Sequence, residues 1–258
     1  MPKIVSIHSF RGGTGKSNTT ANLAVFLAKM GLRVCVVDTD IQSPGIHVLF
    51  HLDPKEIRFS LNDFLWGKCE IEQTTREVFC TAPGTDNGGK VFLIPSSMRT
   101  GDIARVLKFG YDIQLLREGF TQIIAKLEID ILLIDTHPGL NEETLMSIAL
   151  SDTLLIILRP DAQDYQGTAV TVEIARQIEV PNMYLVMNKV PAIFDRAATA
   201  EKARAAFQCP VIGILPHADE MMTLASDGIF VLQHPEHTIT HEIENIARKI
   251  LEQRTSPL

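Results

Sequence analysis

Short runs of apolar residues alternate along this chain with longer stretches in which apolar positions recur at helical spacing. The short runs are rich in Val, Ile and Leu without alternating polar positions, as in strands that are buried on both faces of a sheet. The predicted strands are 4–8, 33–38, 91–94, 131–135, 153–158, 183–188 and 211–215. The predicted helices are 17–30, 114–127, 142–150, 167–178, 197–207 and 241–253. This alternation predicts an α/β fold with a mostly parallel sheet that is flanked by helices.

Two stretches follow the pattern less clearly. Residues 53–80 contain one amphipathic piece around Leu61 and Trp66, and residues 83–89 read P-G-T-D-N-G-G, which is typical of a turn. The sequence contains no internal repeat, low-complexity tract or evident linker. We therefore expect a single domain over residues 1–258.

Composition narrows the functional classes. The chain has 258 residues, 45% of them apolar, and its 24 basic against 31 acidic residues give a net charge of −7, which disfavours a broad nucleic-acid-binding surface. The four cysteines are far apart and form no C-x-x-C pair, so free thiols in a reducing compartment are expected. Neither a signal peptide nor an apolar run of 18 residues is present. These features predict a cytoplasmic protein.

A glycine-rich turn follows the first predicted strand. Residues 10–18 read F-R-G-G-T-G-K-S-N, and a predicted helix begins directly after them. In this context glycines let backbone N–H groups converge on phosphate oxygens, and the helix N-terminus adds about half a positive charge. Lys16 can then neutralise the β- and γ-phosphates, while the Ser17 hydroxyl can ligate magnesium. The alternative is a merely flexible turn.

The strict pattern G-x-x-x-x-G-K-[ST] fails because Phe10 occupies the first glycine position. The segment instead resembles the deviant Walker A loop of the MinD/ParA family, the SIMIBI class of P-loop NTPases, and most of all its MinD-like members. The resemblance implies ATP and Mg²⁺ as cofactors. It implies nucleotide contacts from Gly12, Gly13, Thr14, Gly15, Lys16, Ser17 and Asn18.

Arg11 stands where the family has a signature lysine that reaches the ATP of a partner subunit across a dimer. The resemblance therefore implies a catalytic role for Arg11 in trans, beside Lys16. Arginine keeps the charge of lysine but differs from it in reach and geometry. Alternatively, Arg11 only caps the loop or faces solvent.

Two predicted strands end in aspartates, at the edge where open α/β sheets bind ligands. Asp38 and Asp40 end the strand 33–38, and Asp135 ends the strand 131–135. The resemblance implies that Asp40 orients the attacking water, and that Asp38, Asp135 and Ser17 hold the magnesium. Simple capping of a turn is the alternative for the first two aspartates. We assign no catalytic role to His137, which we expect to face solvent.

Further along, the resemblance implies that Asn188 contacts the adenine ring and that the turn at Pro216 packs around the base. A helix cap or turn role is the alternative for Asn188. The matched motifs extend from residue 3 to about residue 250, loosely over 53–89. They imply the family fold of seven or eight strands.

Several branches of the family are disfavoured by the residues present. Iron–sulfur members need converging cysteines, whose spacing is absent here, although a pair that bridges two subunits stays open. The tail lacks the tyrosine cluster of the bacterial kinases, and the long apolar insertion of the tail-anchored-protein targeting ATPases is missing.

MinD-like and ParA-like members are organised on membranes and DNA respectively. The predicted last helix has an apolar face at Ile243, Ile246, Ile250 and Leu251 and a mixed polar face, so we expect it to pack against the sheet rather than bind membrane. Non-specific DNA binding is possible but not favoured, because the basic residues are scattered over Arg99, Arg105, Lys108, Arg176, Arg196, Lys202 and Arg204.

Two functional hypotheses follow from the sequence. The first is an Mg-ATP-dependent ATPase that dimerises with ATP, hydrolyses it slowly and positions a cellular structure through an adaptor or activating protein. The second is a nucleotide-binding regulatory module with little turnover. The presence of Lys16, Ser17, Asp40 and Asp135 favours the first.

Overall fold

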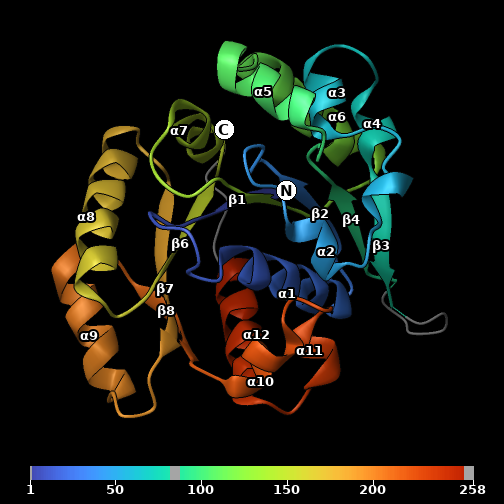
Figure 1. Cartoon of the computed structure of the whole chain (residues 1–258). Coiled ribbons are helices and arrows are strands. Elements are labelled where there is room, and N and C mark those ends of the chain that lie inside the picture. The colour runs from blue at the N-terminus through green and yellow to red at the C-terminus, as the bar shows by residue number, and fades with distance from the viewer. Residues whose placement is uncertain (1, 82–87, 253–258) are drawn as a thin grey trace.

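A computed structural model describes residues 2–81 and 88–252. Its centre is one eight-stranded sheet with the strand order β3-β4-β2-β5-β1-β6-β7-β8 (Figure 1). Every neighbouring pair is parallel except β3 and β4. The strands are β1 (Lys3–His8), β2 (Arg33–Asp38), β3 (Arg76–Cys80), β4 (Lys90–Ile94), β5 (Ile131–Asp135), β6 (Thr153–Leu158), β7 (Asn182–Val190) and β8 (Val211–Pro216). The predicted α/β class and the mostly parallel sheet of seven or eight strands are thereby confirmed.

Helices cover both faces of the sheet (Figure 1). The longer ones are α1 (Lys16–Lys29), α5 (Thr100–Phe109), α6 (Ile113–Lys126), α7 (Glu142–Ala149), α8 (Ala162–Gln177), α9 (Arg196–Phe207) and α12 (Thr238–Leu251). The shorter ones are α2 (Ile46–Leu49), η1 (Pro54–Glu56), α3 (Leu61–Leu65), α4 (Ile71–Thr74), α10 (Asp219–Leu224) and α11 (Phe230–Gln233).

Alternate residues of the central strands point to opposite faces, which divides the core. Val34 and Val36 of β2 pack in the cluster formed with α1 and α12, whereas Cys35 and Val37 pack with α3 and α6. A third cluster joins β6 and β7 to α8 and α9. Because the central strands are buried on both sides, their sequences are apolar throughout, as the hydrophobic pattern indicated.

The last helix packs against the protein, as predicted. Ile243, Ile246 and Ile250 of α12 are buried in the cluster that includes α1, and α12 lies against β8. Within residues 2–81 and 88–252, no helix combines the length and apolar character needed to cross a membrane.

Some elements were not predicted. Strand β3 and the helices α2, α4, α5, α10 and α11 are additional, and α8 begins five residues before the predicted start at 167. Most of the expected turn at 83–89, and residue 253 of the predicted last helix, lie outside the described residues.

The topology gathers the carboxyl ends of the central strands at one edge. Asp38 at the end of β2 pairs in register with Asp135 at the end of β5. β1 lies between β5 and β6, and the loop that follows it is therefore next to Asp135. This edge holds most of the residues that the sequence singled out.

Candidate nucleotide site

The loop between β1 and α1 has the backbone of a phosphate-binding turn. Gly13 and Gly15 have φ of 75° and 92°, and α1 begins directly after Gly15. The backbone angle of Gly15 favours glycine, and a Cβ there would also displace Nδ2 of Asn188. Gly12 and Gly13 are exposed, while Ser17 and Asn18 are partly exposed at the start of α1.

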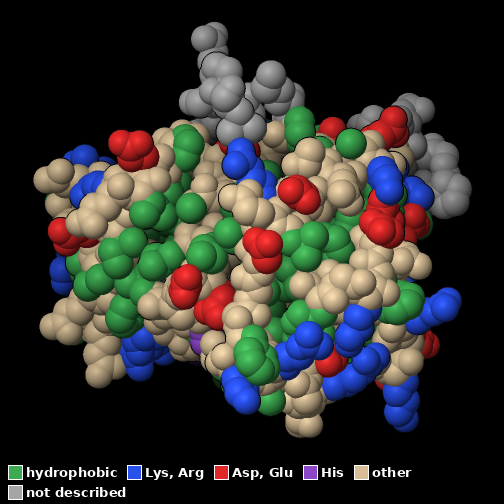
Figure 2. Space-filling model, turned by 90° about the horizontal axis from the view of Figure 1, so that it is seen from above, with side chains coloured by type: hydrophobic (Ala, Val, Ile, Leu, Met, Phe, Trp, Pro, Cys, Tyr) green, Lys and Arg blue, Asp and Glu red, His purple; other side chains and the backbone are tan. Residues whose placement is uncertain are grey.

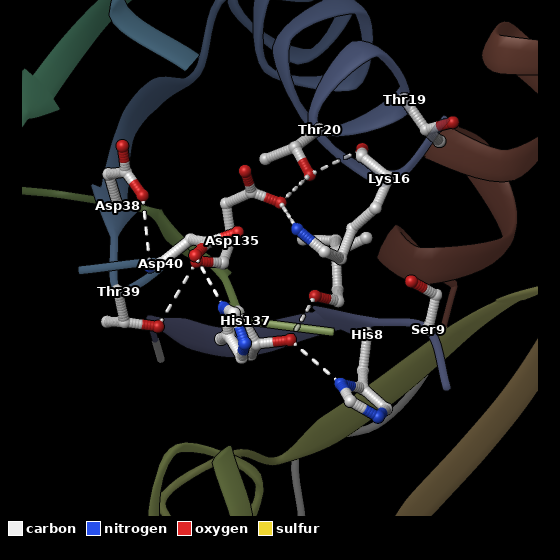
Figure 3. Close-up of polar contacts among 12 residues, drawn as sticks. His8, Ser9, Lys16, Thr19, Thr20, Asp38, Thr39, Asp40, Asp135 and His137 are labelled. Carbon is white, nitrogen blue, oxygen red and sulfur yellow. Dashed lines mark hydrogen bonds and ion pairs between the residues drawn. The ribbon is translucent and has the colours of Figure 1, made fainter. Parts of the chain in front are cut away.

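Lys16 points from α1 toward the end of β5 (Figure 3). Its Nζ donates to Oδ1 of Asp135 at 3.0 Å, and the Thr20 hydroxyl lies 3.3 Å from the same oxygen. Lys16 is only 7% exposed and Asp135 only 1%. The ammonium and the carboxylate thus neutralise each other at the position where a phosphate cradle and a metal ligand are expected.

Three carboxylates lie together at this edge. Asp38 is fully buried, and burial together with the neighbouring Asp135 and Asp40 carboxylates raises its pKa well above the usual range. Its Oδ1 accepts from the backbone N–H of Asp40 at 3.0 Å, whereas its Oδ2 is buried without a hydrogen-bond partner in the described part of the chain. A bound cation would offset the repulsion between this buried oxygen and the neighbouring carboxylates. The donor set therefore fits magnesium.

His137 does not face solvent, so that expectation is wrong. Its ring points toward Asp40 (Figure 3), with Nδ1 2.6 Å from Oδ1, and the histidine side chain is 24% exposed. The sequence could not indicate the pairing, because the two residues are 97 positions apart. Only the parallel pairing of β2 with β5 brings their turns together.

His8 lies buried behind the loop. Burial, with the nearby Lys16 and His137, lowers its pKa to about 3, so its imidazole is neutral at pH 7. The Thr136 hydroxyl donates to the carbonyl of Ile7 at 3.0 Å, and therefore accepts from His8 Nδ1 at 2.9 Å.

Arg11 is held by its own subunit. Its Nη1 lies 3.5 Å from Asp164 and 3.7 Å from Asp161, at the start of α8. Asp164 is 2% exposed and also pairs with Arg159. Neither aspartate was predicted from the sequence. The available signal was Asp161, whose side chain caps α8 by accepting from the backbone N–H groups of residues 163 and 164.

Asn188 and Pro216 line the same pocket, of about 400 Å³, at the start of α1. The Asn188 amide donates to the Thr14 carbonyl at 2.7 Å, and Lys189 Nζ donates to the Gly13 carbonyl at 2.9 Å, so β7 supports the loop from one side. The rest of the pocket is largely apolar, with Leu215 and residues of α10 and α12. It is a site that could enclose a flat apolar ring next to the phosphate cradle.

Three of the basic residues considered for DNA binding are held by contacts within the protein. Arg196 pairs with Glu242, Arg204 with Glu201, and Arg176 donates to the carbonyls that follow α9. On the face that Figure 2 shows, Lys and Arg side chains gather in one area beside hydrophobic ones, and acidic side chains are spread over the remainder. Helix α5, with its Arg105 and Lys108, lies at the top of Figure 1 and so faces the viewer of Figure 2.

The parallel sheet, the glycine-rich loop before α1 and the buried Lys16 define a nucleotide-binding protein of the P-loop class. Comparison with known proteins agrees and is more specific. A family model described as ParA, the NUBPL iron-transfer P-loop NTPases, matches residues 1–251, and the chain belongs to this family.

Several relatives match most of the chain. An uncharacterized ATP-binding protein of Methanocaldococcus jannaschii is 27% identical over 96% of this chain and 87% of its own length. The septum site-determining protein MinD of Bacillus subtilis is 24% identical over 97% and 90%. An iron-sulfur cluster carrier protein of M. jannaschii is 28% identical over 97% and 84%.

Solved structures of MinD share the fold. MinD of Pyrococcus horikoshii complexed with Mg-ADP superposes with a TM-score of 0.78 at 21% identity, covering 98% of this chain and 97% of that one. MinD in the MinC:MinD cell division complex of Aquifex aeolicus superposes with a TM-score of 0.80 at 19% identity, covering 99% and 98%. The resemblance to the MinD/ParA family is thereby confirmed.

Proposed function

We propose that this chain is an ATPase switch that binds Mg-ATP, dimerises with ATP and hydrolyses it slowly in order to position a cellular structure. The observation that carries the proposal is the convergence of Lys16, Asp135 and the Asp38–Asp40 turn beneath the glycine-rich loop. MinD relatives along the full length support the positioning role. By analogy with the MinC:MinD complex, an adaptor or activating protein is the expected partner.

In this proposal the nucleotide and the metal share the edge of the sheet. Residues of the loop, from Gly12 to Asn18, bind the phosphates, and Asn188 and Pro216 border the base. Ser17, Asp38 and Asp135 hold magnesium, which when bound neutralises negative charge that develops on the phosphates. In the nucleotide-bound state, Lys16 would leave Asp135 and contact the phosphates. The phosphates would compete for the Lys16 ammonium, and magnesium would compete for the Asp135 carboxylate.

Catalysis then rests on two further side chains. Asp40 orients the attacking water, and Arg11 leaves Asp161 and Asp164 to supply charge to the nucleotide of a partner subunit. Positioning and charge neutralisation are the main contributions to phosphoryl transfer, so turnover without a partner protein is expected to be slow.

A phosphate-release assay on the wild type, Lys16→Ala and Asp40→Ala tests the proposal. Wild-type turnover that both substitutions reduce to a small residual rate supports the ATPase. Binding of ATP without turnover in the wild type would instead support the alternative, a nucleotide-binding regulatory module. Because Lys16→Ala leaves the Asp135 carboxylate buried without its ion pair, its thermal melting is measured in parallel.

Arg11→Ala tests the dimer separately. Light scattering with Mg-ATP is expected to show a wild-type dimer and a mostly monomeric variant. Arg11→Lys is the matched control, since it restores the charge found in the family. Unchanged dimerisation and turnover in Arg11→Ala would refute a role in trans.

The remaining assignments concern location and surfaces. The free cysteines support a cytoplasmic location. Membrane binding through α12 is not proposed, because its apolar face is buried, and DNA binding is not favoured. Iron transfer, which the family description names, is not proposed either, because Cys35 and Cys209 are buried and the more accessible Cys69 and Cys80 form no C-x-x-C pair.

A further inference from the structure

The turn after β5 contacts the turn after β2 through one short side-chain hydrogen bond. His137 and Asp40 point toward each other (Figure 3), with Nδ1 and Oδ1 2.6 Å apart, and the two side chains are 24% and 11% exposed. Neither residue belongs to a helix or strand. The bond therefore links two loops whose positions the sheet alone does not fix.

Several other contacts hold the two partners at this distance. Thr39 donates to the Asp135 carbonyl twice, from its backbone N–H at 2.9 Å and from its hydroxyl at 3.1 Å. The Thr144 hydroxyl of α7 donates to the carbonyl of His137 at 3.2 Å. The backbone on each side of the bond is thus anchored, which favours one orientation of the imidazole toward the carboxylate.

In the bond between His137 and Asp40, the histidine is the donor, and Oδ2 of Asp40 takes no part. An ionised carboxylate only accepts, so the hydrogen lies on Nδ1 of His137. The backbone N–H of Ser43 donates to the same oxygen, Oδ1, at 3.1 Å. Within the described residues no hydrogen bond reaches Oδ2 of Asp40. With Oδ1 held by two donors, the plane of the carboxylate is set and Oδ2 points in a fixed direction.

We propose that His137 is a positioning residue for Asp40: it fixes the carboxylate whose free oxygen orients the attacking water, and it ties that orientation to the turn after β5. The proposal rests on the function proposed above for Asp40. A shift of the turn after β5 carries the imidazole with it and withdraws one of the two donors from Oδ1. The hydrolysis rate then depends on the conformation of the turn after β5.

Two substitutions of similar size distinguish positioning from simple packing. The Nδ2 group of asparagine occupies nearly the place of Nδ1 of histidine, whereas the Nε2 group of glutamine corresponds to the far nitrogen of the ring. His137→Asn therefore keeps a donor for Asp40, and His137→Gln misplaces it. His137→Ala removes it.

Single-turnover phosphate release and binding of a non-hydrolysable ATP analogue are measured on the full chain with Mg²⁺. We expect His137→Ala and His137→Gln to lower the hydrolysis rate roughly 10- to 100-fold, as misplacement of a reacting group does, with analogue affinity changed less than about threefold. His137→Asn should recover most of the rate. Equal rates for Asn and Gln, or a wild-type rate for Ala, would overturn the proposal.

A double substitution separates this inference from its premise. In an Asp40→Ala background, His137→Ala should cause no further loss, because the group that it positions is gone. An additional loss of the same size would show that His137 acts elsewhere, and would also overturn the proposal. If Asp40→Ala itself hydrolyses ATP at the wild-type rate, the function proposed for Asp40 fails instead, whatever the histidine variants do.

Discussion

At the scale of single residues, Gly13 and Gly15 have similar left-handed backbone angles but different surroundings. A Cβ at Gly13 would meet nothing within 4 Å, whereas one at Gly15 would collide with the Asn188 amide. Gly13→Ala thus introduces backbone strain alone, of about 1–2 kcal/mol. Gly15→Ala introduces the same strain and also displaces the amide that donates to Thr14.

We therefore expect Gly15→Ala to lower ATP affinity much more than Gly13→Ala does. Urea unfolding and titration of a fluorescent ATP analogue measure the two effects separately. Adding Asn188→Ala to Gly15→Ala should relieve the collision and recover part of the lost stability. Equal losses of affinity in the two glycine variants would contradict the steric argument.

His8 provides a pH-dependent prediction. Its pKa is about 3 in the folded protein against 6.5 when exposed, so between these values the unfolded chain binds more protons. The contribution of neutral His8 is therefore fully present above pH 6.5 and is lost as the pH falls toward 3, by at most about 1.4 kcal/mol per pH unit. The raised pKa of Asp38 acts in the opposite direction, since its protonation favours the folded state as the pH falls.

Comparison with a variant isolates the histidine. His8→Asn keeps a donor for Thr136 but does not titrate, and both proteins carry Asp38. Urea unfolding at pH 7.5, 6.0 and 5.0 should show wild-type stability falling relative to that of His8→Asn below pH 6.5. Parallel pH dependences would mean that His8 is not buried in its neutral form.

The site residues that could be predicted from the sequence lie near one another along the chain. The loop from Arg11 to Ser17 combines glycines, a lysine and a hydroxyl in one short segment, and the structure places it between β1 and α1. The contacts of Arg11 with Asp161 and of Asp40 with His137 join distant segments. No local spacing encodes such contacts, because they arise from the order of strands in the sheet.

At the scale of elements, prediction succeeded where burial imposes a pattern. The central strands are apolar on both faces and were found nearly to the residue. β3 is an antiparallel edge strand whose residues are only partly buried or exposed, so its sequence carries no such pattern. The first turn of α8 is mostly polar, so no helical spacing of apolar residues marks it, and the helix was predicted to begin too late. Asp161, which caps the helix, was the available signal for the correct start.

The last helix allows a test at this scale. Ile246 of α12 is fully buried, and its side chain lies against Gly213 of β8. Ile246→Ala should lower the free energy of unfolding by about 2–4 kcal/mol, because a buried aliphatic side chain is replaced by a cavity. Urea unfolding measures the loss, and sedimentation with anionic liposomes is expected to show no membrane binding by either protein. Membrane binding that disappears in a folded Ile246→Ala variant would mean that α12 leaves the sheet.

At the scale of the whole molecule, the sheet order explains how one edge collects the site. Five strands contribute near their carboxyl ends: β1 provides the loop, β2 and β5 the carboxylates, β7 the Asn188 side chain and β8 Pro216. The sequence indicated each contribution separately through a motif at a strand end. The fold adds their arrangement, including the pocket between α1, α10 and the turn at Pro216.

Nucleotide binding should therefore stabilise the molecule as a whole. A ligand at 100 times its dissociation constant adds about 2.7 kcal/mol to the free energy of unfolding, which corresponds to a rise in Tm of roughly 5–10 °C for a domain of this size.

Mg-ADP should give a shift in Tm that is independent of protein concentration. With Mg-ATP in the Asp40→Ala variant, which retains the nucleotide, the Tm should also rise with protein concentration, because a dimer is favoured by mass action. Differential scanning calorimetry over a twentyfold range of protein concentration checks this. A shift with Mg-ATP that does not depend on concentration would show nucleotide binding without dimerisation, and would leave Arg11 no partner subunit on which to act.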